Sequence, residues 1–89
     1  MISHTTDRFR KAYQKLPLNI QRKAREAYQL WKQDQFHPSL QFKRVHSIKP
    51  IYAVRIGIGW RALGVKSRDS VVWFWIGSHE DYNNVISQL

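Results

Sequence analysis

Two arginines, a histidine and a tyrosine fall at positions where they could act together on a phosphate. Arg55 and Arg61 lie on two stretches with strand-like alternation, 51–57 and 60–66, joined by a Gly-Ile-Gly turn. His79 follows the apolar run 71–76, and Tyr82 comes one helical turn later. Cleavage of an RNA phosphodiester without a metal needs a base for the 2′-hydroxyl, cations for the phosphate and an acid for the departing 5′-oxygen. Arginine and histidine can meet these needs, because guanidinium binds phosphate oxygens bidentately and imidazole exchanges protons near neutral pH.

Each of these residues also has a purely structural interpretation. His79 could cap a helix or fill a turn, and either arginine could form an ordinary salt bridge with Asp69 or Glu80. The tyrosine could pack in the core instead of stacking on a base. The sequence by itself leaves these alternatives open.

A basic segment precedes the two arginines. Four candidate RNA-binding residues occur within seven positions: Lys43, Arg44, His46 and Lys49. The chain has 15 Lys and Arg against 6 Asp and Glu, a formal net charge of +9, and residues 69–89 hold three acids but no Lys or Arg. The first two thirds therefore suit a polyanion, although a solvated basic face is the alternative for the segment 43–49.

Composition excludes several other classes of function. The absence of cysteine removes disulfides, Cys-ligated zinc and thiol catalysis. The four histidines have no metal-ligand spacing, so we expect neither a metal site nor a cofactor. The apolar run 71–76 is too short to cross a bilayer. We expect one soluble, cytoplasmic domain over residues 1–89, and the sequence does not predict its oligomeric state.

The elements that must position the candidate residues are predicted from periodicity. Helical spacing follows Thr6 and Asp7 as far as Leu16, and a second amphipathic helix runs from Leu18 to about Gln33. The two helices resemble an antiparallel hairpin. After a loop the period changes from 3.6 to 2, with strands expected at 41–46, 51–57, 60–66 and 71–76. The last of these is apolar on both faces, as in a covered strand inside a sheet. Ser78, with Asp81 three residues later, is typical of a helix start.

The order of elements and six short segments resemble the RelE/ParE superfamily of toxins from bacterial type II toxin–antitoxin pairs. The segments are LP at 16–17, IQRKA at 20–24, HPSL at 37–40, YAVRIG at 52–57, WRALG at 60–64 and WFWIGSHEDY at 73–82. The resemblance implies an α+β fold in which an N-terminal helical hairpin backs a small curved antiparallel sheet of about four strands. A short C-terminal helix and a very short first strand, with room only at 1–4, complete this expected fold.

The resemblance also implies an activity and partners. The common activity of the superfamily is endoribonuclease cleavage of mRNA in the ribosomal A site, which inhibits translation and is neutralised by an antitoxin. The Gly-Ser-His-x-x-Tyr segment is similar to the YafQ-like branch. It implies that His79 is a general acid or base and that Tyr82 faces the substrate. By the same resemblance Arg61 holds the scissile phosphate and Arg55 occupies the basic position of the preceding strand, while no separate general base is assigned.

Two other functions are compatible with the sequence. ParE-type members of the superfamily inhibit DNA gyrase without cleaving RNA, and they generally lack the His motif. A basic RNA- or DNA-binding module without toxicity is the third possibility. The expected partners are an acidic antitoxin that folds on binding, the ribosome and mRNA, with no membrane.

Overall fold

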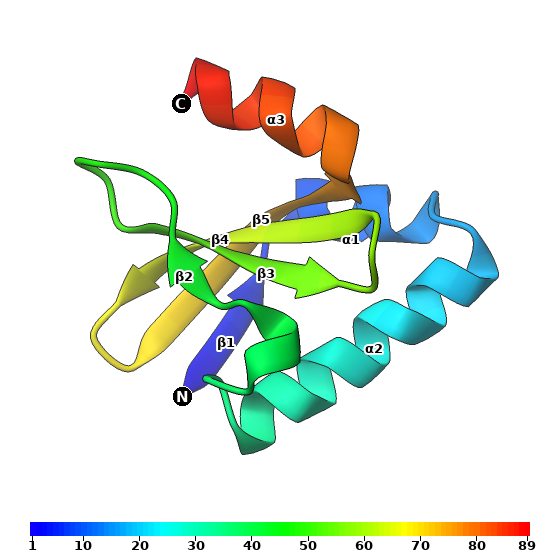
Figure 1. Ribbon diagram of the computed structural model, residues 1–89, viewed down its shortest axis with the longest axis horizontal. Coiled ribbons are helices and arrows are strands. Elements are labelled where there is room, and N and C mark those ends of the chain that lie inside the picture. Colours follow the sequence, from blue (N-terminus) through cyan, green and yellow to red (C-terminus); the bar gives the residue numbers. More distant parts are fainter.

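The computed structural model describes residues 1–89 as a five-stranded sheet with helices on both faces (Figure 1). The elements follow one another as β1 (Ile2–Thr5), α1 (Asp7–Gln14), α2 (Leu18–Gln33), the 3-10 turn η1 (Pro38–Leu40), β2 (Lys43–Arg44), β3 (Ile51–Ile56), β4 (Trp60–Ser67), β5 (Ser70–Ser78) and α3 (His79–Gln88). The strand order in the sheet is β1-β5-β4-β3-β2. The expected order of helix, helix, strands and helix is confirmed, as is the α+β class.

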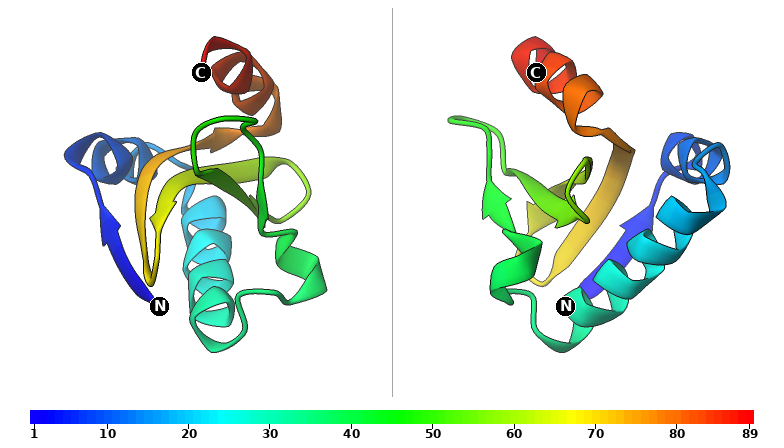
Figure 2. Two further views of the ribbon diagram at one scale, coloured as in Figure 1. Left: turned by 90° about the vertical axis from the view of Figure 1, so that its left-hand side faces the viewer. Right: turned by 45° about the vertical axis from the view of Figure 1, so that its right-hand side comes forward.

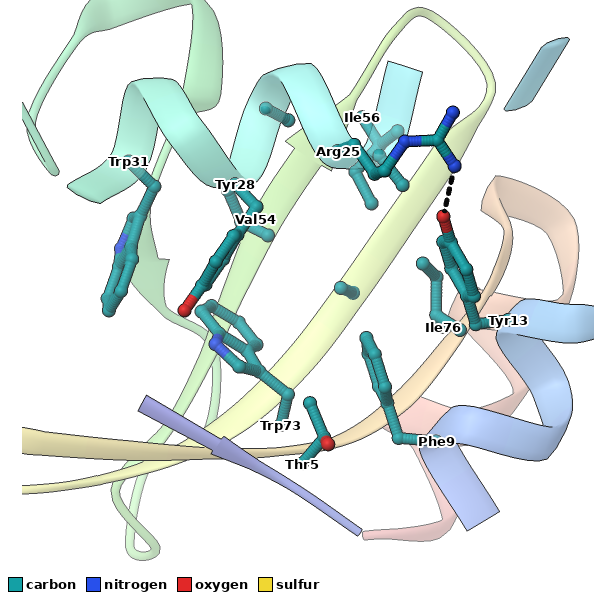
Figure 3. A pocket seen from close by; sticks show the side chains of 13 residues that line it. Thr5, Phe9, Tyr13, Arg25, Tyr28, Trp31, Val54, Ile56, Trp73 and Ile76 are labelled. Atoms are coloured by element: carbon teal, nitrogen blue, oxygen red, sulfur yellow. Dashed lines mark hydrogen bonds between the residues drawn. The ribbon is translucent and has the colours of Figure 1, made fainter. Parts of the chain in front are cut away.

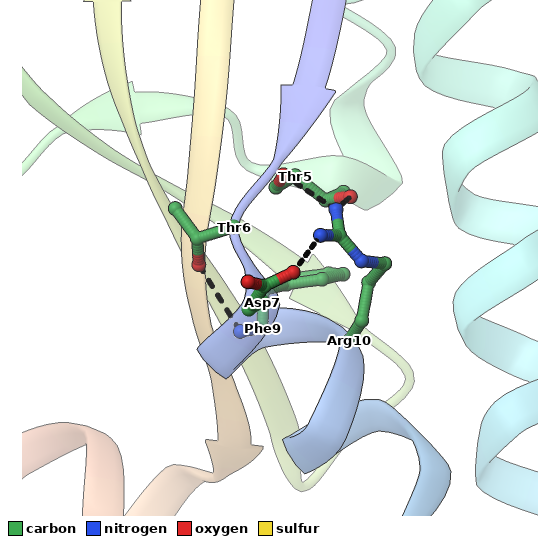
Figure 4. A network of polar contacts seen from close by, with 5 residues as sticks. All are labelled: Thr5, Thr6, Asp7, Phe9 and Arg10. Atoms are coloured by element: carbon green, nitrogen blue, oxygen red, sulfur yellow. Dashed lines mark hydrogen bonds and ion pairs between the residues drawn. The ribbon is translucent and has the colours of Figure 1, made fainter.

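The first helix begins where its capping residues predict. The Thr6 hydroxyl accepts a hydrogen bond from the Phe9 amide at 3.1 Å, and Asp7 places a carboxylate in the first turn (Figure 4). Arg10 pairs with Asp7 and also donates to the carbonyl and hydroxyl oxygens of Thr5, at 2.7 and 2.8 Å. These contacts fix the direction in which α1 leaves β1.

The two N-terminal helices cover one face of the sheet, and α3 covers the other (Figure 2). Pro17 separates α1 from α2, as its restricted backbone predicts. Each helix packs mainly on the sheet, α1 against β5 and α2 against β3. The larger core lies between these helices and the sheet, where Trp31 meets Trp73 edge to face with ring centroids 5.4 Å apart.

Four of the strands, β2 to β5, form the antiparallel sheet that the sequence predicts. The short first strand adds a fifth, because Ile2–Thr5 pairs in parallel with β5 from Ser70 to Trp73. The sheet is therefore mixed, and β5 is an inner strand with neighbours on both sides. This position explains why the run 71–76 is apolar on both faces.

A β-bulge in β5 directs aromatic side chains to both faces of the sheet. Leu63 of β4 lies opposite Trp75, but the next residue, Gly64, lies opposite Trp73, so Phe74 has no partner. Trp73 packs under α1 and α2, whereas Phe74 and Trp75 pack against the small core beneath α3. The bulge thus supplies the apolar floor on which α3 rests.

Gly64 makes room for this arrangement. A Cβ at Gly64 would lie 2.5 Å from Val71 Cγ1 and 2.8 Å from Trp73 Cε3, whereas nothing lies within 4 Å of a Cβ at Gly59. We expect Gly64→Ala to lower the free energy of unfolding by about 1–3 kcal/mol, because the overpacked core must shift. Urea unfolding would measure it, with Gly59→Ala as the matched control. Equal losses in the two variants would contradict the steric explanation.

No helix of the structure combines the length and the apolar character needed to span a membrane.

Candidate active site

The four residues predicted to be catalytic come together around one cavity on the α3 face of the sheet. The cavity has a volume of about 250 Å³ and is lined by Arg55, Arg61, His79 and Tyr82. β3, β4 and α3 each contribute to it. Lys43 of β2 also lines the cavity, so four of its wall residues are basic or contain an imidazole.

The two arginines face each other across the sheet. Arg55 and Arg61 are register partners on the antiparallel strands β3 and β4, and Gly77 of β5 is the next partner of Arg61. Like charges directly opposite one another destabilise a strand pair. Neither arginine pairs with Asp69 or Glu80, because the Asp7–Arg10 pair is the only salt bridge of the structure. An unneutralised pair of guanidinium groups beside a cavity is a binding arrangement for an anion.

The hydrogen bonds of the two arginines orient them without neutralising them. Arg55 Nε donates to the Gly57 carbonyl at 3.0 Å, and Arg61 Nη1 donates to the Trp60 carbonyl at 2.8 Å. The terminal nitrogens of Arg55 have no acceptor within the protein. Partial burial, and then the charge of Arg55, lower the pKa of Arg61. A bound phosphate would relieve that repulsion.

His79 begins α3 beside the turn that joins β3 to β4. Ser78 caps the helix, since its hydroxyl accepts from the Asp81 amide at 3.2 Å. The His79 amide donates to the Gly59 carbonyl at 2.8 Å, which ties the helix start to the turn. Capping therefore belongs to Ser78, and the imidazole of His79 forms no hydrogen bond with the protein.

Tyr82 connects this imidazole to the small core. Its ring lies nearly parallel to the His79 ring, with centroids 5.8 Å apart, and 6.4 Å from the Trp75 ring. Burial raises the pKa of the Tyr82 hydroxyl, an effect that the nearby Arg61 charge partly opposes. Tyr82 therefore packs on the core and lines the cavity at the same time, whereas stacking on a base stays a prediction.

The shifted pKa of Tyr82 predicts a pH dependence of stability. The folded state holds the phenolic proton of Tyr82 more tightly than the unfolded state does. The contribution of Tyr82 to the free energy of unfolding is therefore fully present below the usual pKa near 10 and is lost as the pH rises through the folded pKa. We expect the unfolding free energy of the wild type to fall more steeply between pH about 9 and about 11 than that of Tyr82→Phe. Parallel curves in denaturant titrations would contradict the burial of the hydroxyl.

The basic segment 43–49 is divided between the cavity and its own loop. Lys43 lines the cavity. Arg44 folds back and donates to the carbonyls of His46 and Ile48, at 3.0 and 2.7 Å. His46 Nδ1 accepts from the amides of Ile48 and Lys49, at 3.1 and 2.9 Å. Arg44 and His46 thus shape the loop, and RNA binding by this segment stays a prediction.

Sequence reasoning missed other residues around the cavity. Gln41 lines it and has a left-handed backbone, with φ at 46°. Trp75 supports the Tyr82 ring from below, and a Cβ at Gly77 would lie 2.7 Å from the Trp75 ring. The sequence could have indicated this packing, because Trp75 and Gly77 are two residues apart and such positions share a face of a strand.

A separate apolar cavity lies on the opposite face, between α1, α2 and the sheet (Figure 3). Its volume is about 110 Å³, and 11 of its 13 lining residues are hydrophobic. A hydrogen bond of 2.7 Å from Arg25 to the Tyr13 hydroxyl crosses from α2 to α1 beside it. Its only other polar lining residues are Thr5 and Tyr28, and it holds no histidine or carboxylate, so the candidate active site is the basic cavity.

Comparison with known proteins places this chain in a family. Residues 18–84 match the model of the ParE-like toxin domain. The matched region contains all four cavity residues predicted to be catalytic. The chain therefore belongs to the ParE-like toxin domain family, within the RelE/ParE type of toxins from toxin–antitoxin systems. No curated protein matches the sequence.

Solved structures share the fold at low sequence identity. The RelB–RelE antitoxin–toxin complex from Methanococcus jannaschii matches with a TM-score of 0.73 at 12% identity, over 92% of this chain and 96% of that chain. A copper-bound mutant toxin from Helicobacter pylori matches with a TM-score of 0.70 at 21% identity, over 91% and 97%. A conserved hypothetical protein from Helicobacter pylori gives a TM-score of 0.59 at 19% identity, over 90% and 96%. These likenesses establish the fold.

Proposed function

We propose that the protein is a metal-independent, ribosome-dependent mRNA endonuclease that inhibits translation as the toxin of a type II toxin–antitoxin pair. The observation that carries this proposal is the convergence of Arg55, Arg61, His79 and Tyr82 on one cavity. The Gly-Ser-His-x-x-Tyr segment, which resembles the YafQ-like branch, favours the same activity.

In the proposed reaction the ribose 2′-oxygen attacks the adjacent phosphorus. A P–O bond forms to the 2′-oxygen while the bond to the 5′-oxygen breaks, which leaves a 2′,3′-cyclic phosphate and a 5′-hydroxyl. One proton leaves the 2′-hydroxyl and one reaches the departing 5′-oxygen. We assign one of these transfers to the His79 imidazole and the other to water.

The other cavity residues bind the substrate. The free guanidinium nitrogens of Arg55 and Arg61 contact the scissile phosphate, whose charge increases in the transition state. Tyr82 is protonated at neutral pH, since a phenol ordinarily ionises only near pH 10 and burial raises this pKa further, so it presents a neutral aromatic ring to a base. Lys43 supplies a further charge at the cavity wall.

The test is cleavage of a defined mRNA on programmed ribosomes. We expect cuts in the A-site codon with a 2′,3′-cyclic phosphate on the upstream product. An mRNA carrying 2′-deoxyribose at the cleaved position should stay intact, because it lacks the nucleophile. Survival of the ordinary mRNA, or cleavage of the deoxy-substituted one, would overturn the proposal.

We further propose that the partner is an acidic antitoxin that folds on binding. The net charge of +9 favours an acidic chain, because the two would neutralise each other on association. This proposal predicts a neighbouring gene for a small acidic protein. Coexpression of that protein should restore growth, and binding should weaken as the salt concentration rises.

The second candidate function is non-enzymatic inhibition of DNA gyrase in the cytoplasm. The ParE-like description of the matching family favours it. A supercoiling assay with purified gyrase distinguishes the two functions. Inhibition of supercoiling together with intact mRNA on ribosomes would select the gyrase function.

A further inference from the structure

A second polar cavity lies directly beside the candidate active site. It has a volume of about 450 Å³ and is enclosed by α2, η1 and the turn between β3 and β4. Its polar lining comes from Lys23, Glu26, Ser39 and Arg55, with Gly57 at the turn. We call it the α2 cavity. Arg55 lines both the α2 cavity and the candidate active site, so the two cavities share a wall.

Two cations converge on Gly57 in the α2 cavity. Arg55 Nε donates to the Gly57 carbonyl at 3.0 Å. On the same residue, Lys23 Cδ and Nζ lie 3.3 and 3.8 Å from the place where a Cβ would stand. Glycine is required there, since φ is +60° and a side chain would press on the lysine stem. Neither cation has a carboxylate in salt-bridge contact.

The three cations form a continuous series. Arg61 lies opposite Arg55 in the sheet, and Arg55 and Lys23 both lie against Gly57. A series of unneutralised cations that extends from one cavity into the next matches a polyanion with successive charges, and a lone phosphate would engage only part of it. Glu26 adds an acceptor in the α2 cavity, which matches the exocyclic amino group of a base.

We propose that the α2 cavity binds the nucleotide next to the scissile phosphate, with Lys23 contacting a flanking phosphate. This inference rests on the proposed endonuclease function. Lys23 is a binding residue in this scheme, because the lysine contacts a phosphate other than the one that reacts.

The test combines a protein variant with a neutralised RNA linkage. Lys23→Met keeps the aliphatic stem over Gly57 but removes the charge. The mRNAs carry adenine on both sides of the cleaved position, and one flanking phosphate at a time is replaced by an uncharged methylphosphonate. The measured quantity is kcat/KM for cleavage on programmed ribosomes. Arg22→Met is the matched control, because Arg22 is exposed on the same helix and does not line the cavity.

We expect Lys23→Met to lower kcat/KM about tenfold, and Lys23→Arg to restore most of it. One methylphosphonate position should cost the wild type a similar factor and cost Lys23→Met almost nothing further, because the variant has already lost that contact. Equal effects of Lys23→Met and Arg22→Met would overturn the inference while cleavage by the wild type still supports the proposed function. Equal sensitivity of the wild type and Lys23→Met to every neutral linkage would also overturn the inference and leave the proposed function standing. Absence of cleavage by the wild type would overturn both proposals.

Discussion

His79→Ala is expected to lower the single-turnover rate of mRNA cleavage on programmed ribosomes by about 10²–10⁴-fold, the range typical of a lost general acid or base. His79 carries the only imidazole of the cavity, and it forms no hydrogen bond that the fold needs. The helix cap belongs to Ser78, so α3 should form normally in the variant. Circular dichroism and urea unfolding would verify the fold.

A matched control removes an imidazole elsewhere. His4 is exposed on β1 and does not line the cavity, so His4→Ala should cleave like the wild type. Growth arrest in cells should follow the same order as the cleavage rates. If His79→Ala and His4→Ala cleave equally well, His79 has no role in proton transfer.

Arg61→Gln is expected to lower cleavage by about 10²–10³-fold, as when one donor to a developing oxyanion is removed. The same change should leave the free energy of unfolding unchanged or raise it by a few tenths of a kcal/mol, because it relieves the repulsion from Arg55 across the sheet. Opposite effects on activity and stability are expected where a fold holds like charges together for a ligand. Arg61→Lys should recover only part of the rate, since an ammonium lacks the bidentate geometry.

The control for charge is Lys66→Gln on the same strand. Lys66 lies outside the cavity, over the Tyr52 ring at 5.8 Å from its centroid. This variant should keep nearly full cleavage activity. A large loss of stability in Arg61→Gln, or equal activities of the two variants, would show that Arg61 serves the fold and does not hold the phosphate.

Local patterns predict most of the fold. Helix starts are predictable because capping involves only a few neighbouring residues. The helices α1, α2 and α3 begin directly after Thr6, Pro17 and Ser78. The pairing of β1 could not be predicted in the same way. Four residues carry too little pattern to specify a partner, and the partner strand, at Ser70 to Trp73, is distant in sequence.

In the candidate active site, too, local patterns predict the part that neighbouring residues determine and miss the part that depends on tertiary packing. Arg55 and Arg61 could be placed together because a short Gly-Ile-Gly turn joins their strands and their faces alternate with buried Val54 and Ile56. The α2 cavity escaped prediction, since Lys23 belongs by periodicity to the polar side of a helix. Its meeting with Gly57 depends on how α2 lies across the sheet, which no local pattern contains.

The parallel pairing of β1 with β5 has a consequence for the time course of folding. The larger core needs Trp73, and β1 needs Ser70 to Trp73 as its partner, so neither can form while the ribosome has made only the first helices. Contacts between segments this far apart must close a long loop, which makes folding slower than for a chain of local contacts. The sheet register Arg55–Arg61–Gly77 is completed by the same late strand. A nascent chain therefore completes its larger core, and brings His79 and Tyr82 to the arginine pair, only after β5 and α3 have been made.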